Sequence, residues 1–314
     1  MRYFICKVWF FLFPILIFII FAEIRLRGID NDCKYKNQWL TEYADSVKVL
    51  VLGSSHSYFG VNPDAFRVPA FNAAYVSQYL KRDSFILSKF IHQLTSLQTV
   101  ILPVSMFSPF SLLEKGEEAF RMKNYVLYYD YPFYKTSLKY WFEITNFNFN
   151  NWRQLFYAES YRQCSDLGWG TAYSLSEKDF DGWKLTGKEA AKRHSSNIDM
   201  EVYKENLEIV KGILWLCKSR QINVLLLTTP AYISYRENIS DKRYEQVMAF
   251  CDSLVNDCPG TQYLNLFDDE RFDEDDFFDA DHLSDVGALK LSRILDDYLN
   301  EVHFVDASLM GAER

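Results

Sequence analysis

The sequence lacks any excess of positive charge: 34 Lys and Arg residues stand against 42 Asp and Glu residues, giving a net charge of −8. This balance provides no basic field to hold a nucleic acid. Internal repeats and low-complexity tracts are also missing, which argues against a solenoid or a disordered chain. With 314 residues, 49% of them hydrophobic and 24% charged, the chain is long enough to bury a large core.

The six cysteines include no C-x-x-C pair, and no Cys/His cluster has the spacing of a zinc site. The acidic stretch Asp268–Asp281 lacks the alternation and central glycine of an EF-hand. We therefore expect neither a metal nor a dissociable cofactor. Cys251 and Cys258 leave two interpretations open: a disulfide across a helix-to-strand loop in an oxidising compartment, or two buried thiols.

The N-terminal segment is strongly apolar. Val8–Ala22 is an uninterrupted apolar run of 15 residues, which rises ~22 Å as a helix, short of the ~30 Å hydrocarbon core. Counting Tyr3–Ile24, with Lys7 extending outward, gives about enough length to span a membrane. No small-residue pattern of a signal-peptide cleavage site follows. Residues 1–27 are therefore predicted to be a retained single-pass anchor, although basic residues on both flanks do not set its orientation.

Beyond the anchor, residues 28–45 are predicted to be an exposed linker and residues 46–314 the main domain. Strands are expected to alternate with amphipathic helices there, which indicates an α/β fold with a doubly wound parallel sheet. The expected strands are Val47–Gly53, Ala70–Ala74, Thr99–Val104, Ile222–Thr228 and Thr261–Phe267, and the expected helices are Ser77–Leu97, Glu201–Arg220, Ser240–Val255 and Ser284–Val302. An aromatic-rich insertion at about 106–200 interrupts this alternation and reads as a lid over the carboxyl ends of the strands.

Two short motifs carry residues suited to nucleophilic catalysis. The first is Gly53-Ser54-Ser55 at the end of a buried strand, where open α/β sheets build their sites. The second places Asp279 three residues before His282, directly ahead of the last helix. A carboxylate at that distance can orient the imidazole of a general base. Each motif alone is common, because nine acidic residues fall between Asp268 and Asp281 and serine turns abound.

Together the two motifs resemble the SGNH (GDSL-like) hydrolase superfamily, where the serine follows the first strand and the Asp and His share one C-terminal loop. The resemblance implies a flavodoxin-like three-layer sheet, with Ser55 as nucleophile, His282 as base and Asp279 as the orienting acid. The strings GSSHSYFGVNP and FNAAYVSQ are similar to a membrane-anchored branch that includes alginate O-acetylation and teichoic-acid D-alanine-transfer proteins. The resemblance covers Val47–Val104 and Ile222–Val302 but not the insertion.

This sequence differs from the family at two positions that supply hydrogen-bond donors to the oxyanion hole. The resemblance places Asn72-Ala73-Ala74 where the family has a glycine N–H donor, so the Ala74 N–H is expected to serve instead. The family also has an asparagine side chain as an oxyanion donor after the third strand. That asparagine is absent here, and Ser105 is the residue expected to replace it. Losing one oxyanion donor lowers rates by ~10²–10³-fold in other enzymes.

The sequence therefore predicts serine-dependent acyl-ester hydrolysis or acyl transfer on a cell-envelope glycan or similar acylated small molecule, through an acyl-Ser55 intermediate. The expected location is the membrane, with the catalytic domain outside the cytoplasm and a membrane-bound acyl-transfer protein as a partner. Two alternatives remain open. One is a catalytically silent SGNH scaffold that binds a glycan or a membrane partner, and the other is a cation-binding acidic module at Asp273–Asp281.

Overall fold

The computed structural model describes residues 1–146, 155–156, 160–196 and 198–312. Contacts within the chain divide it into two compact units: the first combines residues 1–38 with 117–163, and the second combines residues 39–116 with 164–314. The predicted boundary at residue 46 therefore does not coincide with a contact boundary. The insertion expected at about 106–200 is divided between the two units.

The second unit is a five-stranded parallel sheet of order β2-β1-β3-β4-β5, the flavodoxin-like order. The strands are β1 (Val49–Val51), β2 (Ala70–Asn72), β3 (Thr99–Pro103), β4 (Asn223–Thr228) and β5 (Thr261–Asn265). In register, Val49 of β1 pairs with Ala70 on one side and Thr99 on the other. The predicted fold class is confirmed, and each strand lies within its predicted range.

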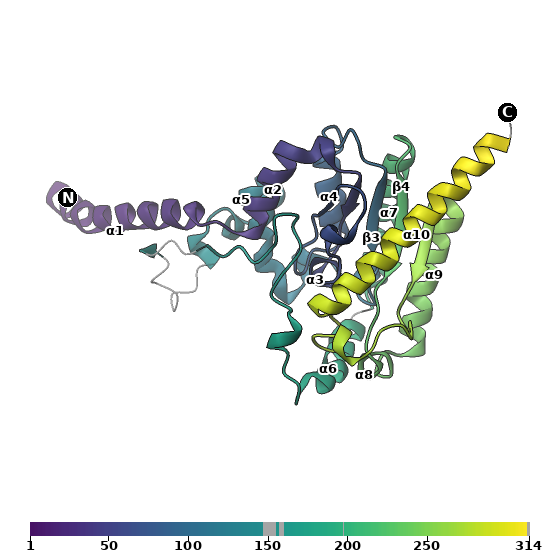
Figure 1. Ribbon diagram of the computed structural model, residues 1–314. Helices are drawn as coiled ribbons and strands as arrows, with labels where there is room; N and C mark the ends of the chain where they lie inside the picture. The colour runs from purple at the N-terminus through teal and green to yellow at the C-terminus, as the bar shows by residue number, and fades with distance from the viewer. Residues whose placement is uncertain (147–154, 157–159, 197, 313–314) are drawn as a thin grey trace. The chain divides into compact units, whose positions relative to one another are not determined.

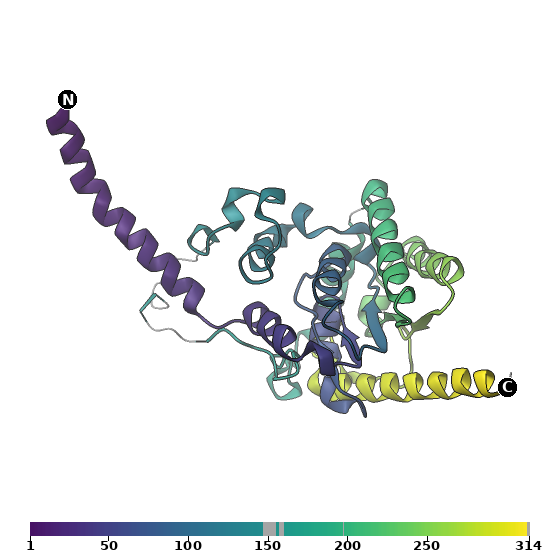
Figure 2. The same ribbon diagram turned by 90° about the horizontal axis from the view of Figure 1, so that it is seen from above.

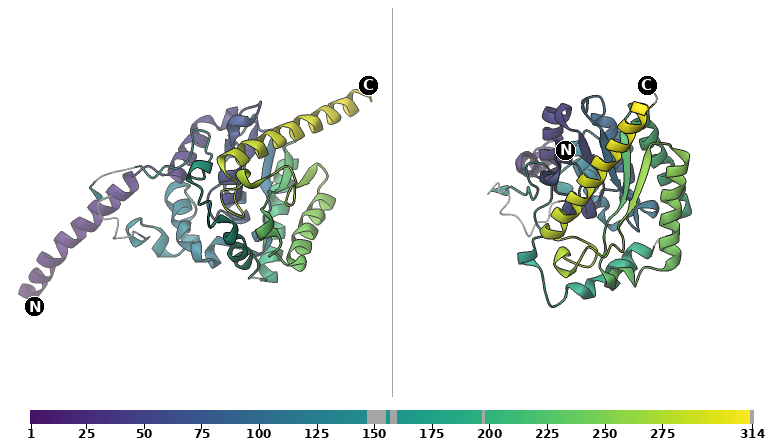
Figure 3. Two further views of the ribbon diagram at one scale, coloured as in Figure 1. Left: turned by 60° about the horizontal axis from the view of Figure 1, so that its bottom comes forward. Right: turned by 45° about the vertical axis from the view of Figure 1, so that its right-hand side comes forward.

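Helices cover both faces of this sheet, as Figure 2 shows. Helix α10 (Asp285–Ala312) lies on one face, while α4 (Leu80–Phe90), α7 (Met200–Lys218) and α9 (Asp241–Asp257) lie on the other. Side chains of a strand alternate between faces, so Val51, Ile101 and Leu227 join the core beneath α10 with Leu291. The shorter helices are α3 (Ser55–Gly60), α6 (Thr186–Ser195) and α8 (Ile233–Arg236). Figure 3 shows α10 crossing the sheet diagonally.

The predicted helix start at Ser284 is confirmed by its cap. The Ser284 hydroxyl accepts a hydrogen bond from the Gly287 N–H at 3.2 Å, which satisfies one of the N–H groups that open α10. Ser284 also donates to the Asp275 carbonyl oxygen at 2.6 Å. The cap therefore fixes the start of α10 to the acidic loop that precedes it.

The first unit contains α1 (Arg2–Gly28), α2 (Asp32–Tyr43, which reaches into the second unit) and α5 (Met122–Tyr128). Helix α1 is long and apolar enough to cross a membrane, with a mean hydropathy of 2.6 over its most apolar 18 residues. Within this unit the returning insertion is held to the α1–α2 region. The Gln163 N–H donates to Asp32 Oδ1 at 2.7 Å, and the Arg162 guanidinium lies 3.7 Å from the centre of the Tyr35 ring.

One expectation requires correction. The stretch 28–45 is not an exposed linker, because most of it forms α2, where the side chains of Cys33, Lys36 and Leu40 are buried. Of the two interpretations left open for Cys251 and Cys258, the structure shows buried free thiols. Their position on and just after α9, where burial raises the pKa of Cys251 to about 12, is that of inert core residues.

Candidate active site

The turn after β1 presents Ser55 at the carboxyl edge of the sheet. Gly53 has φ +111°, and a Cβ there would lie 2.7 Å from Ser57 Oγ, so the sharp turn requires glycine. The chain then enters α3, with Ser54 as its N-cap residue and Ser55 as its first residue. Ser54 and His56 are buried, whereas Ser55 remains partly exposed. The turn thus leaves one hydroxyl within reach of a substrate.

A buried carboxyl group supports this turn from below. Asp83 Oδ1 accepts hydrogen bonds from the Gly53 N–H and from Gln78 Nε2, both at 2.8 Å. Burial raises the pKa of Asp83 to about 7, against the opposing effect of these two hydrogen bonds. Sequence reasoning missed Asp83, because a charged residue at this helix position normally indicates a solvent-facing side chain.

The loop before α10 brings the base to the serine. His282 Nε2 lies 2.8 Å from Ser55 Oγ, and His282 Nδ1 lies 3.0 Å from both carboxylate oxygens of Asp279. Asp279 Oδ1 also accepts the backbone N–H groups of Asp281 and His282, at 3.0 and 2.8 Å. The structure therefore places the three predicted residues in hydrogen-bonded series, the arrangement that nucleophile, base and orienting acid need.

Asp279, rather than Asp281, makes the hydrogen bond to the His282 ring. Asp281 Oδ1 lies farther from His282 Nδ1, at 3.8 Å, which is an electrostatic contact. Burial lowers the pKa of His282, but the charges of Asp279 and Asp281 outweigh it and raise this pKa to about 9. The pair of carboxylates thus favours the imidazolium that a general base becomes after it takes a proton.

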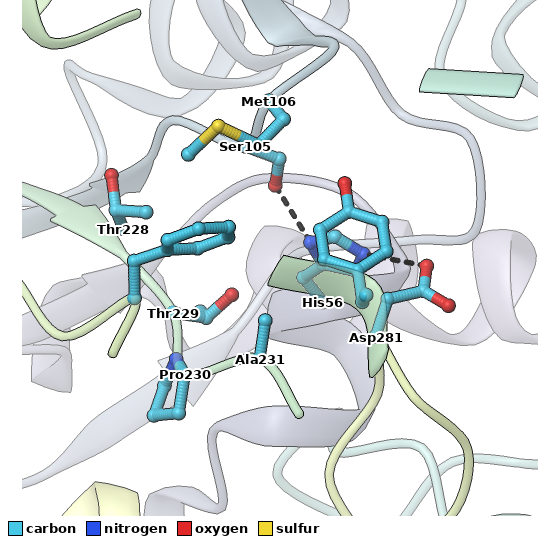
Figure 4. Close-up of a pocket in the computed structure, with 10 residues that line it drawn as sticks. His56, Ser105, Met106, Thr228, Thr229, Pro230, Ala231 and Asp281 are labelled. Carbon is cyan, nitrogen blue, oxygen red and sulfur yellow. Dashed lines mark hydrogen bonds and ion pairs between the residues drawn. The ribbon is translucent and has the colours of Figure 1, made fainter. Parts of the chain in front are cut away.

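His56, Asp281 and Ser105 form a second Ser–His–Asp series beside the first. His56 Nδ1 lies 2.8 Å from Ser105 Oγ, and His56 Nε2 lies 3.3 Å from Asp281 Oδ2 (Figure 4). All three side chains are buried, and the His56 and His282 ring centroids are 4.9 Å apart. The sequence left open whether His56 lines a pocket or contacts solvent, and it favoured Asp279 over Asp281 as the partner of His282. The sequence did contain one indication of their place in the site, because His56 directly follows Ser55 and Asp281 directly precedes His282.

The hydrogen bonds of this second series assign its protons. Burial alone raises the pKa of Asp281, but His282 and His56 outweigh it and hold this pKa well below its usual range. Burial lowers the pKa of His56 more than the hydrogen bond to Asp281 raises it, which favours the neutral ring. Neutral His56 donates from Nε2 to the ionised Asp281, which leaves Nδ1 to accept the hydroxyl proton of Ser105.

These assignments correct the predicted oxyanion donors. The Ser105 hydroxyl has one proton, and it is directed to His56 rather than to Ser55. The Ala74 N–H donates to Asn72 Oδ1 at 3.0 Å. Asn72 Nδ2 donates to the carbonyl oxygens of Ser57 and Val61, both at 2.8 Å, so this side chain braces α3. None of the three supplies a free donor; the backbone N–H groups at the start of α3 remain, because a helix gives its first N–H groups no intrahelical acceptor.

No family model matches the sequence, and no curated protein matches it. Among solved structures, the chain is similar to a candidate platelet activating factor from Streptococcus pneumonia, at 11% identity and TM-score 0.41 over 92% of this chain and 97% of that one. It is also similar to a candidate acylhydrolase from Bacteroides fragilis, at 11% identity and TM-score 0.40 over 84% of this chain and 95% of that one. Likeness at this level is distant.

A third histidine completes the buried cluster. His194, at the end of α6, lies with Nδ1 2.8 Å from the Tyr235 hydroxyl and 4.0 Å from Asp281 Oδ2. Burial lowers the pKa of His194 to about 3, so the ring is neutral. The sequence offered no partner for this residue, because Tyr235 and Asp281 are more than 40 positions away.

A small cavity adjoins the second series. It measures about 10 Å³, enough for roughly one water molecule. Its lining includes His56, Ser105, Thr228, Tyr235 and Asp281 (Figure 4). Met106 and Phe267 also line this space.

Within the described part of the chain, one group of side chains has metal-ligand geometry: His56, Asp281 and His282, whose ligand atoms lie within 4.8 Å of one another. Both nitrogens of His282 are already engaged, Nε2 by Ser55 and Nδ1 by Asp279. A metal held by His282 would have to displace one of these partners. The arrangement therefore suits proton transfer better than metal binding.

Stacked aromatic rings cover one side of His282. Tyr173, from the returning part of the insertion, lies between Phe59 and Phe278, with ring centroids at 3.7 and 4.2 Å. The edge of this stack meets His282, whose centroid is 5.3 Å from that of Tyr173. The insertion thus contributes to the site through Tyr173. Trp183, another aromatic residue of the insertion, is buried in the core.

Proposed function

We propose that this protein is a serine-dependent acyl hydrolase of the SGNH type. The observation that carries the proposal is the unbroken series from Ser55 Oγ through the His282 ring to both oxygens of Asp279, at 2.8 and 3.0 Å. The partial exposure of Ser55 next to buried neighbours and the flavodoxin-like strand order support it.

In the proposed reaction, Ser55 Oγ attacks the acyl carbonyl carbon while His282 Nε2 takes the hydroxyl proton. Asp279 holds the ring in the tautomer that leaves Nε2 free to accept, and Asp281 adds a second negative charge near the imidazolium. The backbone N–H groups at the start of α3 stabilise the oxyanion. The alcohol then leaves with the proton from His282, and water or an acceptor hydroxyl, deprotonated by the same ring, releases the acyl group from Ser55.

We further propose that the substrate is an O-acylated cell-envelope glycan or a similar small molecule, and that α1 anchors the enzyme in the membrane with its catalytic unit outside the cytoplasm. A membrane-bound acyl-transfer protein is the partner that such chemistry would use. Support comes from the apolar length of α1 and from the aromatic side chains that gather beside His282. No bound metal or cofactor is required.

The test of the enzymatic proposal is reaction of the purified protein with a fluorophosphonate, which labels activated serines without knowledge of the substrate. Labelling of the wild type, with none in Ser55→Ala, is the expected result. Hydrolysis and transfer are then separated by forming the acyl-enzyme from an activated ester and adding candidate glycans. Faster release with formation of acylated sugar indicates transfer, and a release rate that no acceptor changes indicates hydrolysis.

The alternative function is a catalytically silent scaffold that binds a glycan or a membrane partner. One observation favours it: the Ala74 N–H and the Ser105 hydroxyl proton, the expected oxyanion donors, are both engaged within the protein. A folded wild-type protein that never reacts with the fluorophosphonate across pH 6–10 would establish this alternative over the enzyme.

A further inference from the structure

The first unit fastens part of the insertion to the end of α1. Glu23 Oε1 and Oε2 accept the N–H groups of Glu143 and Ile144, both at 3.1 Å. One helical turn farther on, Arg27 Nη2 donates to the Trp141 carbonyl oxygen at 2.8 Å. Ile144 also packs against the cluster formed by Ala22 and Leu26. Side chains on one face of α1 therefore set the position of residues 141–144 along the helix axis.

This position corresponds to the headgroup layer of a membrane. The span expected from the sequence ends at Ile24, so Glu23 lies at its edge and Arg27 lies roughly 4.5 Å beyond it along the helix. The polar layer on each side of a bilayer is about 5–7 Å thick. If α1 spans with little tilt, the backbone bonded to Glu23 and Arg27 lies within that layer, whichever end of the helix faces the cytoplasm.

The segment that leads to this point displays large apolar side chains. Phe133, Tyr134, Leu138 and Phe142 are 56%, 73%, 64% and 44% exposed. Trp141 connects them to the anchored backbone: its Nε1 donates to the Phe133 carbonyl oxygen at 3.2 Å, and the two rings meet edge to face at 4.9 Å. Aromatic residues are enriched where membrane and water meet, because one part of the ring is apolar and its edge or hydroxyl tolerates water.

The charges on the segment fit the same surroundings. Lys135 and Lys139 are exposed, with their ammonium groups 6.0 and 4.8 Å from the centres of the Tyr134 and Tyr140 rings. Glu143, which follows the segment, is buried and bonded to Lys123 and Tyr128. The exposed face is therefore apolar and cationic, which suits an anionic lipid surface.

We propose that residues 132–142, here called the platform, lie on the membrane surface from which α1 emerges, with Phe133, Tyr134 and Leu138 inserted among the lipid headgroups. The proposal rests on the membrane anchor proposed above and extends it to a second, non-helical contact. Two attachments, one spanning and one lying on the surface, fix how the first unit is tilted against the membrane plane, which a single helix leaves free.

The experiment uses the full-length protein in lipid nanodiscs of phosphatidylcholine with phosphatidylglycerol, including a trace of phospholipid that carries a diazirine near its headgroup. After illumination, lipid-modified peptides are identified by mass spectrometry. Modification of both the α1 peptide and the platform peptide is expected. Modification of α1 alone would overturn the platform while the anchor stands. Modification of neither would overturn the anchor, and the platform with it.

Variants make the test specific. The triple variant Phe133→Ser/Tyr134→Ser/Leu138→Ser should reduce platform modification at least fivefold, with α1 modification and melting temperature unchanged. The matched control, Phe180→Ser/Leu185→Ser, removes apolar side chains of the second unit that are 63% and 77% exposed and should leave platform modification at the wild-type level. Wild-type platform modification in the triple variant would refute the proposal.

A charge variant removes the remaining ambiguity about folding, because it keeps every apolar side chain. Lys135→Gln/Lys139→Gln should lower platform modification at least twofold in nanodiscs with phosphatidylglycerol and leave it unchanged in phosphatidylcholine alone. An equal response in the two lipids would contradict the electrostatic part of the proposal.

Discussion

Replacing Asp281 with asparagine should move the pH dependence of the reaction toward lower pH. Asp281 Oδ1 lies 3.8 Å from His282 Nδ1, and the Asp281 side chain is 3% exposed, so solvent does little to screen the pair. With an effective dielectric constant of about 20, unit charges at this distance attract by roughly 4 kcal/mol. That energy corresponds to about three units of pKa, which makes a shift of at least one unit the expected outcome.

The sign follows from the role of the base. His282 must be neutral to accept the Ser55 proton, and its pKa is raised to about 9, so the rate should climb with pH until about pH 9. Asp281→Asn removes one of the two charges that raise this pKa, so more of the base is neutral at pH 7. The imidazolium formed during the reaction also loses stabilisation, and the plateau at high pH should fall by about 10- to 100-fold.

The measurement is the second-order rate constant of fluorophosphonate labelling between pH 5 and pH 10. Asp268→Asn is the matched control, because it removes an exposed acid of the same loop region and should leave the profile unchanged. Near-UV circular dichroism checks that the variant keeps its packing around Asp281. An acid limb that stays in place, or that moves to higher pH, would refute the assignment of Asp281 as a charge acting on His282.

Four further outcomes test the site and its support. Ser55→Ala should abolish fluorophosphonate labelling with little change in melting temperature, and a residual labelled serine elsewhere would contradict its role. Asp279→Asn should slow labelling on the order of 10³–10⁴-fold, because Nδ1 loses the carboxylate that sets its tautomer. Gly53→Ala should destabilise the protein by about 1–3 kcal/mol in urea titrations, because φ is +111° and the added Cβ meets Ser57 Oγ. The control is Gly212→Ala in α7, where the added Cβ meets open space and should stabilise the protein by up to about 1 kcal/mol. Asp83 has a raised pKa of about 7, so the native state binds more protons than the unfolded state between about pH 4 and 7. The free energy of unfolding therefore falls as pH rises through that range. Asp83→Asn keeps the hydrogen-bond acceptor but never ionises, so it should flatten that slope in urea titrations across pH 4–8.

The sheet and its flanking helices could be predicted from the sequence because their signals are local. Val49–Val51 and Thr99–Pro103 are continuous apolar strands, and the apolar spacing along α4 and α7 matches helices that cover one face. The pairing of Ser55 with the Asp279–His282 loop was available as well, since parallel strands bring their carboxyl ends to one edge.

The remainder of the site depends on contacts that no local pattern encodes. Ser105 looked like a substitute oxyanion donor from its position in the chain, but the proton it would donate goes to His56, 49 residues earlier. Asn72 looked like part of the same hole and instead holds α3 through two carbonyl oxygens. The prediction of an exposed linker was wrong for a similar reason. Asp32 accepts a hydrogen bond from the Gln163 N–H, which lies 131 residues later in the chain.

The order of the site residues along the chain has a consequence for biosynthesis. Ser55 follows the first strand, whereas Asp279 and His282 lie on the last loop, 224 and 227 residues later. At roughly 5–20 residues per second, about 11 to 45 seconds separate the synthesis of the nucleophile from that of its base. Throughout that interval, the emerging chain carries a serine of ordinary reactivity. Chains that stop before His282 stay in that state, so Ser55 gains its proposed base only in molecules whose synthesis has passed the last loop.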